Sequence, residues 1–334
     1  MSRYAEAHVS PKGPGDARPT ALQIIRDEGL ENKLRDKVIV ITGVSSGIGI
    51  ETVRALAATG ATLILTARDV SKAESALADM LDASRMRIVQ MDNASLASVR
   101  SAAAAILEET SKVNVLINNA GVMFIQTREL TEDGYEMQFA TNHLAHFLLF
   151  NLLKPALLAA STPEFPSRVV NVSSGGHRVA GINETGNYNH EAGGYDPALS
   201  YGQSKTANIY MANEIDRRYG GKGIHATSLH PGIINTPLAR HMPQAQIDAI
   251  VSAEGFRTVM KSPEQGAATT VWAAVGAEWA HRGGRFLSGC AETVEGERSD
   301  LFNEGIHAPH AYDPEKEARL WRDSLKMVGL KDDQ

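Results

Sequence analysis

A phenol and an ammonium group stand four residues apart in the stretch YGQSK, which runs from Tyr201 to Lys205. On a helix, both side chains would leave the same face. A free tyrosine has a pKa of about 10, too high for easy proton exchange near neutrality, and a neighbouring ammonium lowers that pKa by stabilising the tyrosinate. The pair could therefore act as a general acid and base on a carbonyl oxygen. The same spacing also fits two solvated side chains on a helix, so the rest of the chain has to decide.

A second stretch, TGVSSGIG from Thr42 to Gly49, has the composition of a phosphate-binding loop. It follows the β-branched run 38–41 and precedes a helical pattern. Its glycines would let the backbone approach a pyrophosphate, and the start of the following helix would offer free N–H groups. The alternative is a tight strand–helix turn without a ligand. The predicted cofactor contacts in this loop are Gly43, Ser45, Ser46, Gly47, Ile48 and Gly49.

The end of the second strand distinguishes between the two nicotinamide dinucleotides. An acidic residue at this position would accept a hydrogen bond from the ribose 2′-hydroxyl and favour NAD. Arg68 stands there instead, followed by Asp69. A guanidinium can bind a 2′-phosphate through two hydrogen bonds and stack on adenine. We therefore predict NADP(H) in preference to NAD(H); in the alternative, Arg68 is solvated and Asp69 binds the ribose.

Strands and helices alternate around these motifs, and the strands are apolar throughout. This alternation predicts an α/β fold with one doubly wound parallel sheet of about seven strands and helices on both faces. Residues 1–35 form an N-terminal extension, of which 1–20 are predicted to be a flexible lead. Residues 36–305 form the main domain, and 306–334 form a C-terminal tail. The strands are expected within residues 36–43, 62–68, 86–92, 112–121, 167–174, 223–232 and 284–290.

Composition excludes several functional classes. The 334 residues carry a net charge of -6, and no cluster of Lys and Arg forms a footprint for nucleic acid. The single cysteine, Cys290, excludes an internal disulfide and favours a reducing, cytoplasmic compartment. Polar residues interrupt the apolar run 144–160, so we predict a buried helix there and no membrane span. His143 and His146 could share a metal, but no third ligand is evident, and we predict that both pack in the core.

Five motifs together carry a family resemblance. TGVSSGIG, NNAG (118–121), VNVSS (170–174), YGQSK and HPG (230–232) occur in the order and rough spacing of the short-chain dehydrogenases/reductases. The resemblance covers about residues 36–305. The stretch TNHLAHFLL, the long interval between Ser174 and Tyr201, and the tail DPEKEARLWRDSLKMVGL resemble the retinol-dehydrogenase-like branch of this family. That branch includes reductases of many hydrophobic aldehydes and ketones, so it does not name a substrate.

The resemblance implies a Rossmann fold and four catalytic residues, with Tyr201 as the general acid and base. Lys205 would lower the pKa of Tyr201 and bind the nicotinamide ribose. Ser174 would orient the substrate carbonyl, with Ser173 as the competing candidate. Asn142 would shape the long helix and hold a water that links Lys205 to solvent.

The resemblance also implies further cofactor contacts and an assembly state. Residues after the third and fourth strands would meet the adenine and its ribose, and residues after the sixth would lie beside the nicotinamide. Family members commonly pair through two helices, so a homo-oligomer, either a dimer or a tetramer, is implied. The implied cofactor contacts are Asp92, Asn93, Asn119, Ala120, Gly121, Tyr201, Lys205, Pro231, Gly232, Ile234 and Thr236.

Residues 233–262 would supply a lid over the substrate. Their apolar side chains favour a hydrophobic or aromatic carbonyl compound, unless they simply pack against the body of the protein. The function that follows is an NADP(H)-dependent oxidoreductase interconverting a carbonyl and an alcohol. One alternative is a catalytically silent NADP(H)-binding sensor or scaffold. Another is an epimerase or dehydratase on the same fold, which would need a larger C-terminal domain than the tail provides.

Overall fold

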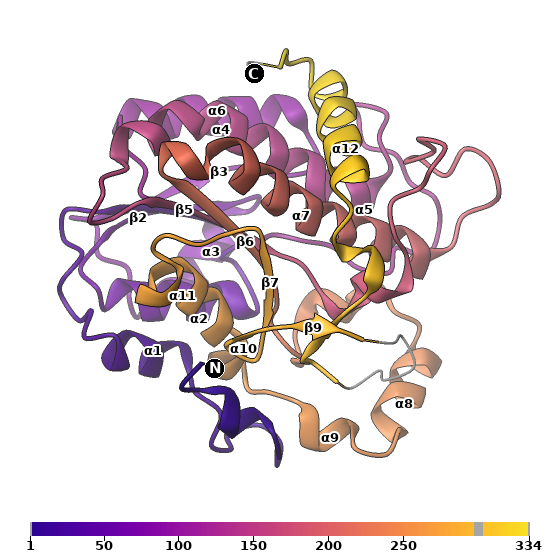
Figure 1. The fold of residues 1–334 in the computed structure, drawn as a ribbon, viewed down its shortest axis with the longest axis horizontal. Helices are drawn as coiled ribbons and strands as arrows, with labels where there is room; N and C mark the ends of the chain where they lie inside the picture. Colours follow the sequence, from indigo (N-terminus) through magenta and orange to yellow (C-terminus); the bar gives the residue numbers. More distant parts are fainter. Residues whose placement is uncertain (1, 297–302, 333–334) are drawn as a thin grey trace.

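The predicted sheet is present in the computed structural model, which describes residues 2–296 and 303–332. Seven strands run parallel in the order β3-β2-β1-β4-β5-β6-β7, and β8 adds a short antiparallel edge (Figure 1). The strand order reverses between β1 and β4, which is where ligands bind in doubly wound sheets. The strands are β1 (Val38–Thr42), β2 (Thr62–Ala67), β3 (Met86–Gln90), β4 (Val115–Asn118), β5 (Ser167–Val172), β6 (Ile224–His230), β7 (Arg285–Ser288) and β8 (Ala291–Glu292).

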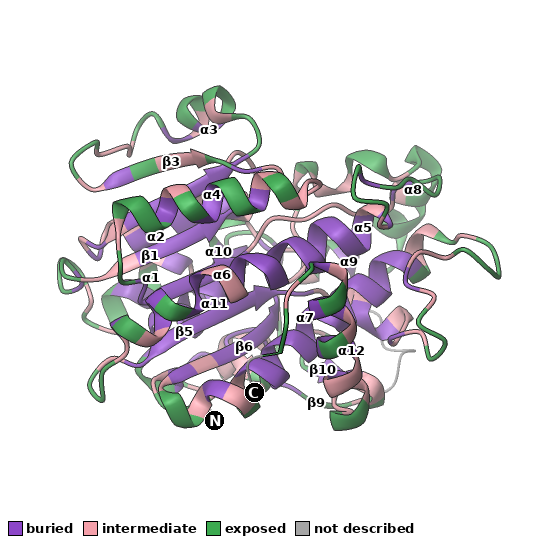
Figure 2. Ribbon diagram, turned by 90° about the horizontal axis from the view of Figure 1, so that it is seen from above, coloured by how far each residue is buried: buried purple, intermediate pink, exposed green. Residues whose placement is uncertain are grey.

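Helices cover both faces of this sheet, because the strands are apolar on both sides. Figure 1 shows helices on both sides of the sheet, and Figure 2 shows β5 in the purple of buried residues. One layer contains α4 (Leu96–Glu109), α6 (Ala145–Ala160), α7 (Pro197–Tyr219) and α12 (Pro314–Met327). The other contains α1 (Ala21–Asp27), α2 (Ile48–Ala57), α3 (Val70–Leu77) and α11 (Ala268–Val275), with the short α10 (Pro263–Gly266) between α1 and α2.

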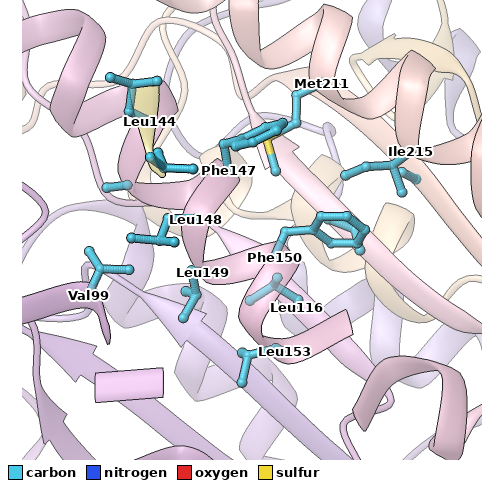
Figure 3. Close-up of a cluster of buried hydrophobic side chains, with 14 of the residues drawn as sticks. Val99, Leu116, Leu144, Phe147, Leu148, Leu149, Phe150, Leu153, Met211 and Ile215 are labelled. Atoms are coloured by element: carbon cyan, nitrogen blue, oxygen red, sulfur yellow. The ribbon is translucent and has the colours of Figure 1, made fainter. Parts of the chain in front are cut away.

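The apolar run 144–160 is the centre of the first layer. Figure 3 shows its side chains between β4, α4 and α7. The helix Met137–Ala160 is the one segment of the described chain with the length and composition of a membrane span, and 67% of its most apolar window is buried in the fold. Its apolar face is therefore used by the protein core. The labelled residues are Val99, Leu116, Leu144, Phe147, Leu148, Leu149, Phe150, Leu153, Met211 and Ile215.

The two helices that carry catalytic candidates begin in different ways. The long helix begins with α5 (Met137–Phe139) and passes through a π-helical turn, η2 (Ala140–Leu144), before α6. The helix with Tyr201 begins at Pro197, where the Asp196 carboxylate accepts hydrogen bonds from two N–H groups of its first turn. Tyr201 therefore lies within α7, in its second turn.

The two ends of the chain belong to the packed structure. The prediction of a flexible lead over residues 1–20 is wrong, because Tyr4 is 6% and Arg18 only 3% exposed. The C-terminal helix α12 lies against α7 and buries Trp321 in the core (Figure 1). Near the tail, β9 (Val294–Glu295) and β10 (Ile306–His307) form a separate two-stranded parallel sheet.

The predicted lid contains η5 (Pro237–His241), α8 (Gln244–Ser252) and α9 (Phe256–Val259). Phe256 is the apolar side chain that packs fully into the body, at 6% exposure, while Ile250 is 41% exposed. Figure 2 shows α8 largely in the green of exposed residues, at one end of the molecule. The apolar surface of α8 is therefore not used up by packing against the body.

Candidate active site

The sequence motifs converge at the carboxyl ends of β1, β4, β5 and β6. Tyr201 and Lys205 share one face of α7, and the Lys205 Nζ lies 5.6 Å from the centroid of the Tyr201 ring. Ser174 begins the short helix η3 (Gly175–Val179), and its hydroxyl lies beside the Tyr201 ring: a Cβ at Gly176 would be 3.3 Å from the Ser174 Oγ and 2.7 Å from the Tyr201 Cε1. The structure therefore brings these three predicted residues together.

The hydroxyl groups of Ser173 and Ser174 have different hydrogen-bond partners. The Ser173 hydroxyl is 2% exposed and donates to the backbone oxygen of Lys205 at 2.7 Å. That bond ties the end of β5 to α7. The Ser174 hydroxyl accepts from the Gly176 N–H at 3.0 Å and faces the phenol. The geometry favours Ser174 as the residue that meets a substrate.

Burial controls the protonation of Tyr201 and Lys205 in the protein alone. It raises the pKa of Tyr201 to about 12, against the smaller lowering effect of the nearby Ser174 hydroxyl. It also lowers the pKa of Lys205 to about 7. The expected lowering of the Tyr201 pKa by Lys205 is therefore absent, because desolvation of the buried phenolate dominates and Lys205 itself loses its proton near neutrality. Tyr201 is a protonated phenol at neutral pH.

Asn142 lies in the π-helical turn and joins two parts of the site. Its amide Oδ1 accepts from the Val122 N–H at 2.8 Å, and its Nδ2 donates to the Val122 oxygen at 3.0 Å and to the Ser204 hydroxyl at 2.9 Å. Asn142 thus holds the segment after β4 against α7, between Tyr201 and Lys205. A Cβ at Gly121 would lie 3.1 Å from the Asn142 Oδ1 and 3.4 Å from the Lys205 Nζ, so only glycine leaves this space open.

Thr42 and His146 form a link that the sequence interpretation missed. The Thr42 hydroxyl accepts from the N–H groups of Asn119 and Ala120 at 2.9 and 3.0 Å, and lies 2.9 Å from the His146 Nε2. The His146 Nδ1 lies 2.9 Å from the Asn142 oxygen. Burial lowers the pKa of His146 to about 4, so its ring is neutral. The predicted packing role is thus accompanied by a hydrogen-bonded connection from β1 to Asn142.

No group of three or more His, Cys, Asp or Glu side chains in the described residues could hold a metal ion. The other histidine of the pair, His143, lies 2.8 Å through its Nε2 from the Ser324 hydroxyl of α12. That contact connects the long helix to the C-terminal helix.

The phosphate loop owes its shape to close backbone contacts. A Cβ at Gly43 would lie 2.7 Å from the Ala120 Cα, and one at Gly49 would lie 2.3 Å from the Gly43 oxygen. The Asn119 Nδ2 donates to the Thr42 and Gly43 oxygens, which fixes the loop to the end of β4. Gly47 has a φ of 63° and is the N-cap of α2. Ser45, Ser46 and Ile48 complete the turn, all half-buried.

The side chains of Arg68 and Asp69 differ in the contacts that they make within the protein. The Asp69 carboxylate accepts from the Lys72 N–H at 2.9 Å and caps α3. Arg68 is exposed, and within residues 2–296 and 303–332 no carboxylate forms a described ion pair with its guanidinium. Asp69 therefore has a structural role that does not require a ribose.

The predicted adenine contacts lie at the end of β3. The Asp92 carboxylate accepts from the Ala94 N–H at 2.9 Å. The Asn93 amide turns inward, where its Nδ2 donates to the Thr141 oxygen at 3.2 Å and lies 3.1 Å from the His146 Nε2. The Asn93 side chain thus supports the long helix, and its adenine contact stays a prediction.

The nicotinamide candidates follow β6 as residues 231–236. Gly232 has a φ of 106°, and a Cβ there would lie 2.7 Å from the Lys261 Cδ. Thr236 lies against the phosphate loop, because a Cβ at Gly47 would be 3.5 Å from the Thr236 side chain. Thr236 therefore lies beside the phosphate loop, and the nicotinamide contacts of Pro231, Gly232, Ile234 and Thr236 stay predictions.

Phe124 is a further site residue that the motifs do not mark. Its ring centroid lies 5.9 Å from that of Tyr201, at an interplanar angle of 40°. Its φ of 56° is unusual for a residue with a side chain. The buried Gln138 Oε1 holds this conformation by accepting from the Phe124 N–H at 2.8 Å, and Tyr195 donates to the next carbonyl, that of Ile125, at 3.0 Å.

Comparisons with known proteins identify the family. A family model described as short chain dehydrogenase matches residues 37–247. A short-chain dehydrogenase/reductase of Penicillium roqueforti is 48% identical over 328 residues, which cover 98% of this chain and 95% of that protein. Retinol dehydrogenase 13 of Homo sapiens is 38% identical over 299 residues, covering 88% and 85%.

A crystal structure of an uncharacterized protein from Mycobacterium Paratuberculosis aligns with a TM-score of 0.65 at 32% identity, covering 88% of this chain and 94% of that one. The chain belongs to the short-chain dehydrogenase/reductase family, and the resemblance to its retinol-dehydrogenase-like branch is confirmed. It has the Rossmann fold of this family and is an oxidoreductase of the carbonyl/alcohol type.

Proposed function

We propose that this protein is an NADP(H)-dependent reductase of hydrophobic or aromatic ketones or aldehydes, with Tyr201 as the proton donor. One observation carries the proposal: Ser174, Tyr201 and Lys205 converge beside Gly121, where a side chain would press on Asn142 and Lys205. When bound, the nicotinamide cofactor would supply or accept the hydride. The glycine cradle at Gly43 and Gly49 and the space at Gly121 fit a dinucleotide laid across the carboxyl ends of the strands.

Each of these residues would have a distinct part in protonating the substrate oxygen. The Ser174 hydroxyl would donate to the carbonyl oxygen and orient it. The Tyr201 phenol, protonated at neutral pH, would give its proton to the same oxygen. Lys205, with a pKa lowered to about 7, would stabilise the resulting tyrosinate and return a proton to it. Asn142 would hold the segment after β4 in place while these protons move.

The silent sensor or scaffold is the second candidate from the sequence. It would be favoured if any catalytic group were turned away or tied up in structural bonds, as Ser173 is. The Ser174 hydroxyl and the Tyr201 side chain instead lie side by side, and Lys205 lies against the Tyr201 ring. The test is oxidation of NADPH with a panel of aldehydes, aromatic ketones and quinones. Turnover of any member supports the reductase, and binding of NADPH without turnover supports the scaffold.

Two properties remain proposals that rest on the family resemblance and the composition. We propose a homo-oligomer, and a cytoplasmic location in which Cys290 stays reduced. Burial raises the pKa of Cys290 to about 11, so its thiol is protonated and unreactive at neutral pH.

The preference for NADP(H) makes a prediction about Arg68. Replacing Arg68 by alanine should raise the Kd for NADPH by about 10- to 100-fold, because a charge-assisted contact with the 2′-phosphate is lost. The Kd for NADH should change little. Fluorescence titration of both cofactors measures the two constants.

The matched control is Arg87→Ala, which removes an exposed arginine of β3. It should leave both constants unchanged. Equal losses for NADPH and NADH in Arg68→Ala would contradict the assignment, as would tighter binding of NADH by the unmodified protein.

The position of Phe124 makes a prediction about substrate shape. Its half-buried ring lies against Tyr201, so it is placed to contact a flat substrate held at the phenol. Phe124→Ala should lower kcat/KM for an aromatic ketone by about tenfold, since stacking and contact area are lost together. An aliphatic ketone of similar size should lose much less, and Phe124→Leu should fall between. A steady-state comparison of kcat/KM for the two substrates tests this prediction. An equal loss for both would contradict it and would mean that Phe124 only holds Tyr201 in position.

A further inference from the structure

The predicted nicotinamide segment, residues 231–234, is bound by Lys261, the last residue of the short segment 258–261 in the predicted lid. The Lys261 N–H donates to the Ile233 oxygen at 2.8 Å, and Ile234 and Lys261 form a parallel β-bridge. The Lys261 Nζ lies 3.4 Å from the Pro231 oxygen and 2.5 Å from a carboxylate oxygen of Glu304. The position of residues 258–261 therefore sets the position of residues 231–234.

The other side of residues 258–261 is held by the N-terminal extension, through residues 13–18, which we call the strap. The Gly13 N–H donates to the Thr258 oxygen at 2.8 Å. The Arg18 guanidinium donates to the Val259 oxygen at 2.7 Å and to the Met260 oxygen at 2.5 Å. Three consecutive carbonyls next to Lys261 are thus bound by the strap, from about 240 residues away in the sequence.

Arg18 is built into the fold and does not merely rest on its surface. Its side chain is 2% exposed, and its Nε donates to the Asp16 carboxylate at 2.8 Å. It also donates to the Gly13 oxygen at 3.1 Å. A buried charge is tolerated only when it is paired and its hydrogen bonds are satisfied. Gln265, which is 2% exposed, completes the arrangement by binding the backbone of Gly15, Asp16 and Arg18.

We propose that the strap is a positioning element for the nicotinamide half of the cofactor site, with Arg18 as its positioning residue. The order of contact runs from the strap to residues 258–261 and from there to residues 231–234. The ends of β2 and β3, which would bind the adenosine half, lie on the other side of β1 in the sheet. Loss of the Arg18 contacts should therefore disturb one half of the cofactor site and spare the other. The inference rests on the proposed cofactor binding.

Binding of two different ligands tests the two halves of the cofactor site independently. NADPH fills both halves, whereas 2′-phospho-ADP-ribose lacks the nicotinamide ring. Arg18→Met keeps the aliphatic bulk and removes the donors, so it should raise the Kd for NADPH about tenfold or more and leave that for 2′-phospho-ADP-ribose within about twofold. The control is Arg3→Met in the same extension, because the hydrogen bonds of Arg3 within the described residues go to Asp27 and Glu28 beside α1. Equal weakening of both ligands, no weakening of either, or the same result in Arg3→Met would overturn the proposal.

Hydrogen exchange without any ligand gives a second readout, independent of cofactor choice and of turnover. Amides of residues 232–236 should exchange faster in Arg18→Met, while those of 43–49 in the phosphate loop should not. If the unmodified protein binds no dinucleotide, the proposed function fails, but this exchange pattern still tests the strap. Should Arg18→Met not fold, Arg18→Lys retains the charge without the planar fork and should show the same pattern more weakly. Uniform acceleration across both segments would mean that the strap contributes only general stability.

Discussion

Replacing Tyr201 by phenylalanine should lower kcat/KM for carbonyl reduction by about 10²- to 10⁴-fold, the usual contribution of a positioned general acid. The phenol is the protonated group that lies beside Ser174, and burial keeps it protonated by raising its pKa to about 12. Phenylalanine removes the transferable proton and keeps the ring. The measurement is steady-state reduction of an aromatic ketone by NADPH, with the Kd for NADPH determined alongside.

The ring of Tyr201 also has a packing role, which the phenylalanine variant preserves. A Cβ at Gly176 would lie 2.7 Å from the Tyr201 Cε1, so the ring lies close against η3. Tyr210→Phe is a matched control, because Tyr210 lies on the same helix and donates its hydroxyl to His310 away from the site. It should retain turnover. Full turnover in Tyr201→Phe would contradict the assignment of the proton donor.

Lys205→Met should produce a protein that is inactive and yet more stable than the unmodified one. Lys205 is 3% exposed, and burial lowers its pKa to about 7 from an ordinary value of 10.5. That shift corresponds to a destabilisation of at most about 5 kcal/mol at low pH, and relaxation of the site would reduce it. Methionine fills similar space without a charge. The Val172 oxygen, which accepts from the Lys205 Nζ, would keep a second donor in the Asn208 amide.

The gain in stability from Lys205→Met should depend on pH. Below pH 7 the lysine is protonated in both the folded and the unfolded protein, so the full cost of burying the charge is present. Between pH 7 and 10.5 the unfolded state binds more protons than the folded state, and stability therefore rises with pH through this group. The gain in Tm from Lys205→Met should thus be largest near pH 6 and nearly vanish near pH 10. A gain that does not change with pH would mean that Lys205 keeps its ordinary pKa.

Motifs in the sequence were enough to predict the sheet and the catalytic group. The alternation of apolar strands with helices predicts that the strands of the sheet run parallel. The spacing of four residues predicts that Tyr201 and Lys205 share one face of α7. Such features depend on neighbours in the chain, so they can be predicted from the pattern alone. The family resemblance already favoured Ser174 over Ser173, and the structure adds a physical reason, because the Ser173 hydroxyl is bound to the backbone of α7.

What the sequence could not show depends on contacts between distant segments. The lead was predicted to be flexible from its Pro and Gly content, but Arg18 finds its partners at Val259 and Met260. The lowered Tyr201 pKa was predicted from the nearby ammonium, but the degree of burial decides the direction. The unusual backbone of Phe124 is imposed by Gln138, and no local motif marks it.

The central claim is that this protein moves a hydride between NADPH and a carbonyl carbon. The most direct measurement supplies NADPH deuterated at the transferable position of its nicotinamide, together with an aromatic ketone, and analyses the product by mass spectrometry. We expect an alcohol that carries deuterium on its carbinol carbon, formed by the unmodified protein and absent with Tyr201→Phe. Cofactor that binds but transfers deuterium to no carbonyl in a broad panel would contradict the account and favour a silent NADP(H)-binding protein.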